Sequence, residues 1–205
     1  MTRIPALVLV TDRTATGVRD LVAVVETALA AGLPAVQLRE KDLPGRPLLA
    51  LAERLRAATA RAGALLFVND RVDVAIACGA DGVHLGGASM PVDVARRLLG
   101  DRALLGVSTH APGEAPAGAD FAFFGPVWAT PSKSGTQGAA RLAAAVRAAP
   151  IPVLAIGGVT PARVADVRAA GAAGVAVIRA ILAAEDPGAA TRALLEGVAT
   201  LPNAD

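Results

Sequence analysis

The stretch ALLFVNDRVDVAIACGADGVHLGG (residues 64–87) contains the unit from which the whole chain is built. Its first part, ALLFVND, is a short apolar run typical of a buried strand, and GVHLGG at its end is another. Between them, RVDVAIACGA has the length and the apolar spacing of a helix. A strand, a helix and a second strand in this order predict one β-α-β unit of a parallel sheet.

The same alternation continues along the chain. We expect strands at residues 6–12, 35–40, 64–70, 82–87, 104–110, 121–128, 152–158 and 174–182. Helical segments are expected at 18–32, 47–63, 71–80, 91–100, weakly at 111–119, and at 139–149, 161–171 and 188–201. This pattern predicts a single-domain (β/α)8 TIM barrel over residues 1–205. The alternative, an open doubly wound sheet, is disfavoured because TDRTATG (11–17) after the first strand is not a G-x-G-x-x-G turn.

The composition limits the classes of protein to which the chain can belong. With 54% apolar residues it can bury a large core, and 205 residues suit one domain. The net charge is only +2, the basic residues are scattered and tyrosine is absent, so we expect no nucleic-acid partner. The lone Cys78 excludes a disulfide framework and a cysteine zinc site. No apolar run is long enough for a membrane span or a signal segment, which predicts a cytoplasmic protein without a membrane partner.

Polar residues collect where the predicted strands end. In a barrel, the loops at this face carry the chemistry. The distribution therefore predicts an enzyme, with candidate residues Asp12, Gln37, Arg39, Asn69, Asp70, His84, Ser108, His110, Thr130 to Lys133, Gly157 and Gly158.

The segment QLREK (37–41) is a candidate anion site. Gln37, Arg39 and Lys41 alternate, so they project to one face of a strand. Two cations at that place would be costly to desolvate without an anion, and arginine and lysine both suit phosphate. The alternative is structural ion pairing with Glu40 or Asp42.

The segment ATPSKSGTQG (129–138) is a second candidate. Thr130, Ser132 and Lys133 supply two hydroxyls and a cation that suit a diphosphate, and a closing loop would exclude water. Its turn-forming residues are equally typical of a solvated loop.

A third candidate is the Gly157–Gly158 pair, which stands between a predicted strand and the start of a helix at Thr160. Backbone N–H groups in such a turn can hold a phosphate. Arg179, at the end of the last predicted strand, could add a cation. The alternative for Arg179 is a surface pairing with Glu185 or Asp186.

Metal and proton chemistry depend on few residues. Asn69 and Asp70 could hold Mg²⁺ through oxygen together with substrate phosphates, although Asp70 could equally cap the following helix. His84 lies within an apolar strand, which favours a structural histidine over a metal ligand. His110 is the group best placed to move protons near neutral pH.

The residues resemble one family along nearly the whole chain. LVTDR, VQLREKDLPGR, VNDRVDVAIACGADGVHLG, LLGVSTH, GPVWATPSK and AIGGVTP are similar, in this order, to the thiamine phosphate synthase / thiazole tautomerase family. Resemblance to the synthase implies that a hydroxymethylpyrimidine diphosphate and a thiazole phosphate are joined with release of diphosphate. The implied mechanism is dissociative, with Mg²⁺ as cofactor and small phosphorylated substrates as partners.

The resemblance also implies roles for residues. Asp70 matches a Mg²⁺ ligand, and Lys133, Ser108 and His110 are the candidate catalytic residues. The implied substrate-binding residues are Gln37, Arg39, Lys41, Asn69, Thr130, Ser132 and Lys133 for the diphosphate, and Gly157, Gly158, Ile178 and Arg179 for the thiazole phosphate.

Two positions depart from the family pattern. Ser89 stands where the second magnesium carboxylate is expected, and Arg179 stands where a phosphate-binding serine is expected. We predict a synthase because the diphosphate-binding side chains are kept. The alternatives are a thiazole tautomerase, in which His110 would move protons, and a non-catalytic phosphate-binding barrel. The sequence leaves open whether the chain forms a homo-oligomer.

Overall fold

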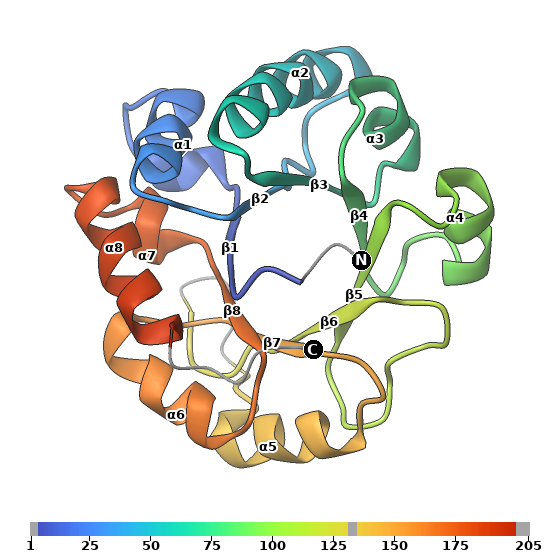
Figure 1. Cartoon of the computed structure of the whole chain (residues 1–205), viewed down its shortest axis with the longest axis vertical. Helices are drawn as coiled ribbons and strands as arrows, with labels where there is room; N and C mark the ends of the chain where they lie inside the picture. Colours follow the sequence, from blue (N-terminus) through green and yellow to red (C-terminus); the bar gives the residue numbers. More distant parts are fainter. Residues whose placement is uncertain (1–3, 131–134, 200–205) are drawn as a thin grey trace.

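The fold is a closed barrel of parallel strands, which confirms the predicted TIM barrel (Figure 1). The computed structural model describes residues 4–130 and 135–199. Pairing of Val8 with Ala176 joins the first strand to the last and closes the sheet. The strands follow one another around the barrel in sequence order: β1 (Leu7–Val10), β2 (Ala35–Leu38), β3 (Leu65–Asn69), β4 (Gly82–Leu85), β5 (Leu104–Thr109), β6 (Phe121–Phe124), β7 (Val153–Ile156) and β8 (Gly174–Val177).

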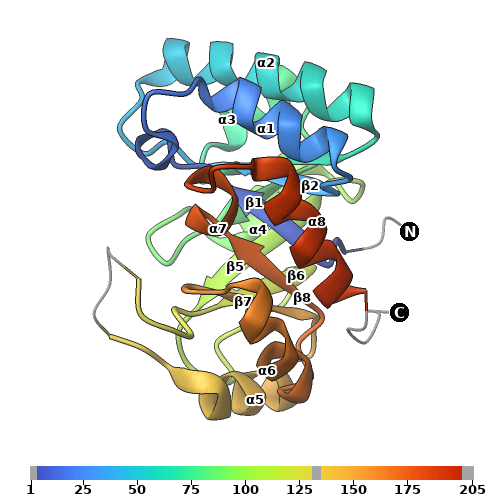
Figure 2. The same cartoon turned by 90° about the vertical axis from the view of Figure 1, so that its left-hand side faces the viewer.

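Helices surround the barrel, and Figure 2 shows α1 and α2 packed side by side along it. Local signals set their ends. The Asp20 carboxylate accepts a hydrogen bond of 3.0 Å from the Ala23 N–H at the start of α1, and Gly63 ends α2 in the left-handed conformation. The helical segments are η1 (Arg13–Thr16), α1 (Leu21–Ala30), α2 (Gly45–Ala62), α3 (Val72–Cys78), α4 (Val92–Leu99), α5 (Gly138–Ala148), η2 (Pro161–Arg163), α6 (Val164–Ala169), α7 (Arg179–Leu182) and α8 (Pro187–Val198).

Two apolar clusters form the core. One fills the lumen, where Phe67, Phe121 and Phe123 pack with ring centroids 5.4–5.6 Å apart. The other lies between the outer faces of the strands and the helices. Side chains alternate between the two along each strand, so the lumen-facing positions continue to the mouth of the barrel.

Two predicted elements were wrong. The last strand ends at Val177 rather than residue 182, because Ile178 leaves the extended conformation and RAIL forms α7, with Ile181 and Leu182 buried. Residues 111–119 form turns instead of a weak helix. Two prolines and two glycines with positive φ, Gly113 at 82° and Gly118 at 90°, prevent a helix there.

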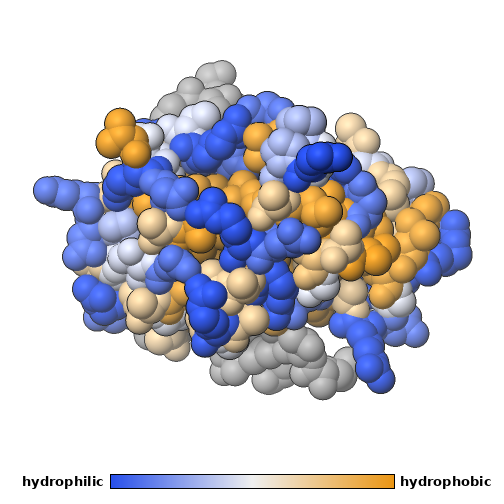
Figure 3. Space-filling model, turned by 90° about the horizontal axis from the view of Figure 1, so that it is seen from above, coloured by the Kyte–Doolittle hydropathy of each residue, from blue (hydrophilic) through white to orange (hydrophobic). Residues whose placement is uncertain are grey.

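The surface mixes hydrophilic and apolar residues, as the face in Figure 3 shows. Among the described residues, the large apolar side chains that are exposed are Val18, Ile76 and Leu98. Within residues 4–130 and 135–199, no helix has the length and apolar character needed to cross a membrane.

Candidate active site

The carboxyl ends of the strands meet at one mouth of the barrel because all strands are parallel, and two cavities open there. The larger, which we call the β8 pocket, has a volume of about 620 Å³. The smaller, the β3 pocket, has a volume of about 210 Å³. The β8 pocket is lined by Asp12, Thr14, Ala129, Thr130, Ile156, Gly157, Gly158, Val159, Thr160, Ala176, Val177, Ile178, Arg179, Ala180 and Ala183. The β3 pocket is lined by Leu38, Glu40, Lys41, Leu43, Leu48, Asn69, Asp70 and Arg71.

The glycine turn after β7 forms one wall of the β8 pocket. Gly157 and Gly158 have φ of 95° and 65°, a region that residues with a Cβ rarely adopt. A Cβ on Gly157 would lie 2.6 Å from the Pro126 Cα, and one on Gly158 would lie 2.7 Å from the Trp128 Cβ. The Trp128 N–H also donates to the Gly157 carbonyl at 3.0 Å. The loop after β6 therefore packs directly on this turn and leaves no room for larger residues.

The same turn is held from the side of η2. The guanidinium of Arg163 donates to the Gly158 carbonyl at 2.6 Å and lies 5.2 Å from the centroid of the Trp128 ring. The helices that follow, η2 and α6, are short, so a phosphate at this wall would interact with backbone N–H groups more than with a helix dipole.

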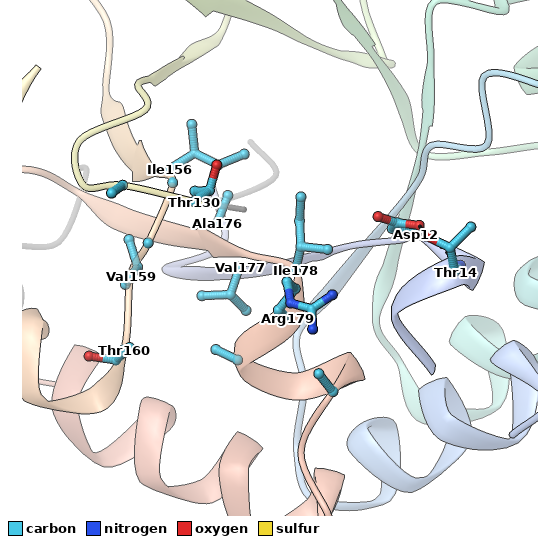
Figure 4. A pocket seen from close by; sticks show the side chains of 15 residues that line it. Asp12, Thr14, Thr130, Ile156, Val159, Thr160, Ala176, Val177, Ile178 and Arg179 are labelled. Atoms are coloured by element: carbon cyan, nitrogen blue, oxygen red, sulfur yellow. Dashed lines mark hydrogen bonds between the residues drawn. The ribbon is translucent and has the colours of Figure 1, made fainter. Parts of the chain in front are cut away.

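Arg179 lies on the opposite wall of the β8 pocket, with Asp12 and Thr14 nearby (Figure 4). The sequence predicted that Arg179 ends the last strand, but it is the first residue of α7. Its side chain is exposed. Within the described chain it makes no ion pair with Glu185 or Asp186; the Asp186 carboxylate instead accepts from a backbone N–H at the start of α8. Its charge is therefore available to a ligand.

Asp12 is less available, because its carboxylate accepts from the backbone N–H and the hydroxyl of Thr14 at 3.0 Å and 2.5 Å. Thr130 and Ile178 line the β8 pocket. Ile178 therefore lies beside Gly157, Gly158 and Arg179, the residues predicted to share its role. Thr130 was predicted to bind the diphosphate with Lys41 and Asn69, which line the β3 pocket instead. The other predicted residues of the loop after β6, Ser132 and Lys133, lie outside the described residues.

A chain of amide and carboxylate groups crosses the mouth from β2 to β3. The side-chain amide of Gln37 donates to the Asn69 Oδ1 at 2.9 Å, and the Asn69 amide donates to the Asp70 Oδ2 at 2.6 Å. Gln37 is 2% exposed and its carbonyl oxygen has no partner. A buried acceptor without a donor is costly, so a ligand N–H group would be bound favourably there.

Asp70 is held by β4 and the loop that follows it. Its Oδ1 accepts from the Gly86 N–H at 3.0 Å and, in a short contact, from the Ser89 hydroxyl. Burial alone would raise the pKa of Asp70, but these two hydrogen bonds and the charge of Lys41 lower it below its usual value. Asp70 does not cap the following helix, the alternative considered from sequence, since α3 has no side-chain cap.

The oxygen donors fit Mg²⁺ only as a site shared with a ligand. Among the described residues, no group of three or more histidine, cysteine or acidic side chains could hold a metal. Asp70 is the one carboxylate in the hydrogen-bonded group of Gln37, Asn69, Asp70 and Ser89. Its Oδ1 accepts from Gly86 and Ser89 and its Oδ2 from the Asn69 amide, so a metal would bind through a second lone pair of Oδ2. Mg²⁺ commonly binds through one or two carboxylates plus substrate phosphates and water, so this donor set suits it.

The two cations of QLREK lie beyond the end of β2. Glu40 and Asp42 form ion pairs, but with Arg13: the Arg13 Nη1 lies 3.0 Å from the Glu40 Oε2, and its Nη2 contacts Asp42. The predicted alternative, pairing of Arg39 or Lys41 with these acids, does not occur among the described ion pairs. Arg13 was not among the residues predicted from sequence, because nothing in the local sequence shows that residue 13 meets residue 40.

His84 and Ser108 form a pair inside the lumen. The His84 Nε2 lies 3.0 Å from the Ser108 hydroxyl, and the ring packs on Phe123 with centroids 4.2 Å apart. Burial lowers the pKa of His84 to about 3, and its Nδ1 has no partner. Gly106 makes room for this ring, since a Cβ there would lie 2.6 Å from the Nδ1. His84 is thus a neutral residue that holds Ser108, and not a metal ligand.

His110 lies away from both pockets' linings and is exposed. Its Nδ1 lies 2.6 Å from the Gly125 carbonyl, which can only accept, so Nδ1 carries the proton and Nε2 is left as an acceptor. Its role in proton transfer stays a prediction.

Known proteins resemble this chain in sequence and in fold. The family model described as thiamine monophosphate synthase matches residues 7–181. A putative thiamine-phosphate synthase of Geobacter sulfurreducens is 55% identical over 197 residues, which cover 93% of this chain and 92% of that protein. A thiamine-phosphate synthase of Gloeobacter violaceus is 52% identical over 86% of this chain, which spans 54% of that protein. The structure of a thiamine phosphate pyrophosphorylase from Pyrococcus furiosus superposes with a TM-score of 0.86 at 37% identity, covering 94% of this chain and 95% of that one.

Proposed function

The chain belongs to the thiamine monophosphate synthase family, and on that premise we propose that it joins a hydroxymethylpyrimidine diphosphate to a thiazole phosphate, giving thiamine phosphate and diphosphate. The observation that carries the proposal is the presence of two cavities, of about 620 Å³ and 210 Å³, at one barrel mouth. The β3 pocket and the β8 pocket each contain a cation, Lys41 in the first and Arg179 in the second. Two phosphorylated substrates could therefore bind side by side.

The β3 side suits the pyrimidine diphosphate. Lys41 supplies positive charge next to Asp70, and Arg39 lies close enough to influence the pKa of the lumen histidine, His84. The unpartnered Gln37 oxygen and the Ser108 hydroxyl face the same lumen and could bind an amino-substituted, nitrogen-containing ring. The diphosphate would then lie at the rim, where its charge remains near Arg39 and Lys41.

The β8 side suits the thiazole phosphate. Gly157 and Gly158 line the pocket on one wall, where their backbone N–H groups could donate to a phosphate, and the Arg179 guanidinium can donate from the other. Ala176, Val177 and Ile178 provide an apolar surface between these walls for a ring. For the two substrates to react, the ring nitrogen would have to face the methylene group of the pyrimidine.

The reaction breaks one bond and forms one. The C–O bond between the pyrimidine methylene and the diphosphate breaks, and the bonding electrons leave with the diphosphate. The thiazole nitrogen then donates its lone pair to the methylene carbon to form the new C–N bond. Arg39 and Lys41 stabilise the negative charge of the leaving group, and the apolar lumen excludes water that would otherwise capture the carbon cation.

Mg²⁺, when bound, would neutralise part of the diphosphate charge and so assist its departure. Asp70 would hold it together with the oxygens of the substrate. The Ser89 hydroxyl is neutral and cannot supply the negative charge of a second carboxylate ligand. We therefore expect Mg²⁺ to bind mainly as part of the diphosphate complex. The Ser89 hydroxyl contributes indirectly, because it orients the Asp70 carboxylate.

The test is an assay of the pure protein with both substrates and Mg²⁺, in which thiamine phosphate and released diphosphate are measured together. We expect equal amounts of the two products. Lys41→Met should reduce turnover strongly, whereas Arg61→Met, a change at an exposed arginine that pairs with Glu26, should not. Absence of thiamine phosphate at saturating Mg²⁺ would refute the proposed function.

A further inference from the structure

We propose that Arg19 is a positioning residue for the β8 pocket: it holds α7, and with it Arg179, against the loop that follows β1. The inference rests on the proposed function, since the phosphate that Arg179 contacts is that of the thiazole substrate. It concerns a side chain that lines neither pocket and acts only through backbone contacts.

The short helix α7 needs support from outside. It has four residues, and its first flanking residue, Ile178, makes no side-chain cap. An isolated helix of this length is unstable, because the cost of forming the first turn exceeds what one or two hydrogen bonds return. Yet Arg179, Ala180 and Ala183 from this segment form a wall of the β8 pocket. Something else must therefore fix α7.

Arg19 supplies that support with three donors. Its Nη1 donates to the Ala184 carbonyl at 2.8 Å and its Nη2 to the Leu182 carbonyl at 2.6 Å. These carbonyls stand at the end of α7, where the helix itself offers no N–H partner. The Nε donates to the Thr16 carbonyl at 3.1 Å, on the loop after β1. One planar guanidinium thus joins two segments that are far apart in the sequence.

The contacts also fix Arg19 itself. The Thr16 hydroxyl donates to the Arg19 carbonyl at 2.8 Å, and the side chain of Arg19 is partly buried. In the described part of the chain, Arg19 forms no ion pair with a carboxylate, so its donors are directed to carbonyl groups.

The two segments that Arg19 joins are the two sides of one pocket wall. Asp12 and Thr14 stand on the loop after β1, Arg179 stands on α7, and all three line the β8 pocket (Figure 4). η1 and α7 are in contact, and Arg19 lies where they meet. Loss of its guanidinium would leave the carbonyls at the end of α7 without donors and let Arg179 shift from its place in the pocket.

The test uses Arg19→Gln, with Arg61→Gln as the matched control because Arg61 forms an exposed ion pair with Glu26 away from both pockets. Arg19→Gln should raise the KM for thiazole phosphate about tenfold, the effect of weakening one hydrogen bond to a charged group. The KM for the pyrimidine diphosphate and kcat should stay within about twofold, since none of the described residues that line the β3 pocket belongs to α7. Arg19→Lys keeps the charge and one donor direction, so its KM for thiazole phosphate should lie between those of the wild type and Arg19→Gln.

Hydrogen exchange of residues 179–184 provides a second readout that needs no turnover. In Arg19→Gln this segment should exchange faster than in the wild type, while Arg61→Gln should leave it unchanged. An unchanged KM, equal increases for both substrates, or unaltered exchange in Arg19→Gln would overturn the proposal. A wild type that makes no thiamine phosphate would refute the proposed function, while the exchange measurement would still decide whether Arg19 holds α7.

Discussion

Acid should destabilise this protein through one side chain of the lumen, His84. The ring is 1% exposed, and burial, opposed in part by the charge of Asp70, lowers its pKa to about 3. In the unfolded chain the imidazole titrates at about 6.5. Between these two values the unfolded chain binds a proton that the folded protein does not bind. The contribution of unprotonated His84 to the free energy of unfolding is therefore complete above pH ~6.5 and is lost as the pH falls toward ~3.

The size of the effect follows from the two pKa values. Lowering the pH from about 7 to about 4.5 should reduce the free energy of unfolding by about 2.5 kcal/mol through His84 alone. That loss is a large fraction of the ~5–15 kcal/mol by which a domain is usually stable.

The measurement is urea unfolding at a series of pH values for the wild type and for His84→Gln. The glutamine amide does not titrate and can still reach the Ser108 hydroxyl, and the carboxylates that also titrate in acid are the same in both proteins. The free energy of unfolding of the wild type should fall by about 2.5 kcal/mol more than that of the variant between about pH 7 and pH 4.5. Parallel pH dependences would show that the ring is solvated or partnered in solution, and would refute the reasoning.

Three further predictions concern the two pockets. Arg179→Ser should weaken thiazole phosphate by ~1.5–3 kcal/mol in calorimetry, because a charged donor is lost, and should leave diphosphate affinity unchanged; equal losses for both ligands would contradict a role in the β8 pocket. Ser89→Asp should tighten Mg²⁺ in the presence of diphosphate, measured with Mn²⁺ as a paramagnetic probe, because it adds a second carboxylate beside Asp70; no tightening would show that residue 89 lies outside the metal's reach. Gly158→Ala should lower the free energy of unfolding by at least ~1–2 kcal/mol, since its φ is positive and Trp128 leaves no space, whereas Gly87→Ala, at an open position, should change it little.

The architecture of this protein was predictable from local sequence. Short apolar runs such as ALLFV (64–68) alternate with helix-length segments, and this periodicity depends only on which residues can pack on one face. Polar residues at the ends of these runs, Asn69 and Asp70 among them, had to reach the same mouth once the strands were parallel. The barrel and the position of the candidate site on it therefore followed from the order of residues alone.

Individual hydrogen bonds and ion pairs could not be predicted from the local sequence. Pairing of Glu40 with Arg39 or Lys41 was the alternative considered from sequence, but Glu40 pairs with Arg13 from another strand end. Asp70 was an equal candidate for a helix cap and instead bonds to Gly86 and Ser89. In each case the local sequence offered a neighbouring partner that the folded chain does not use.

The end of the last strand could not be predicted from the local sequence either. VIRAIL (177–182) has the composition of a strand, but Ile178 turns and the segment becomes α7, where Ile181 and Leu182 are buried and Arg19 binds the final carbonyls. Sequence determines which residues are apolar and at what spacing, because these properties act between neighbours. Only the closed barrel decides which distant donor meets which acceptor, because register and packing bring such atoms within hydrogen-bond distance after the chain has folded.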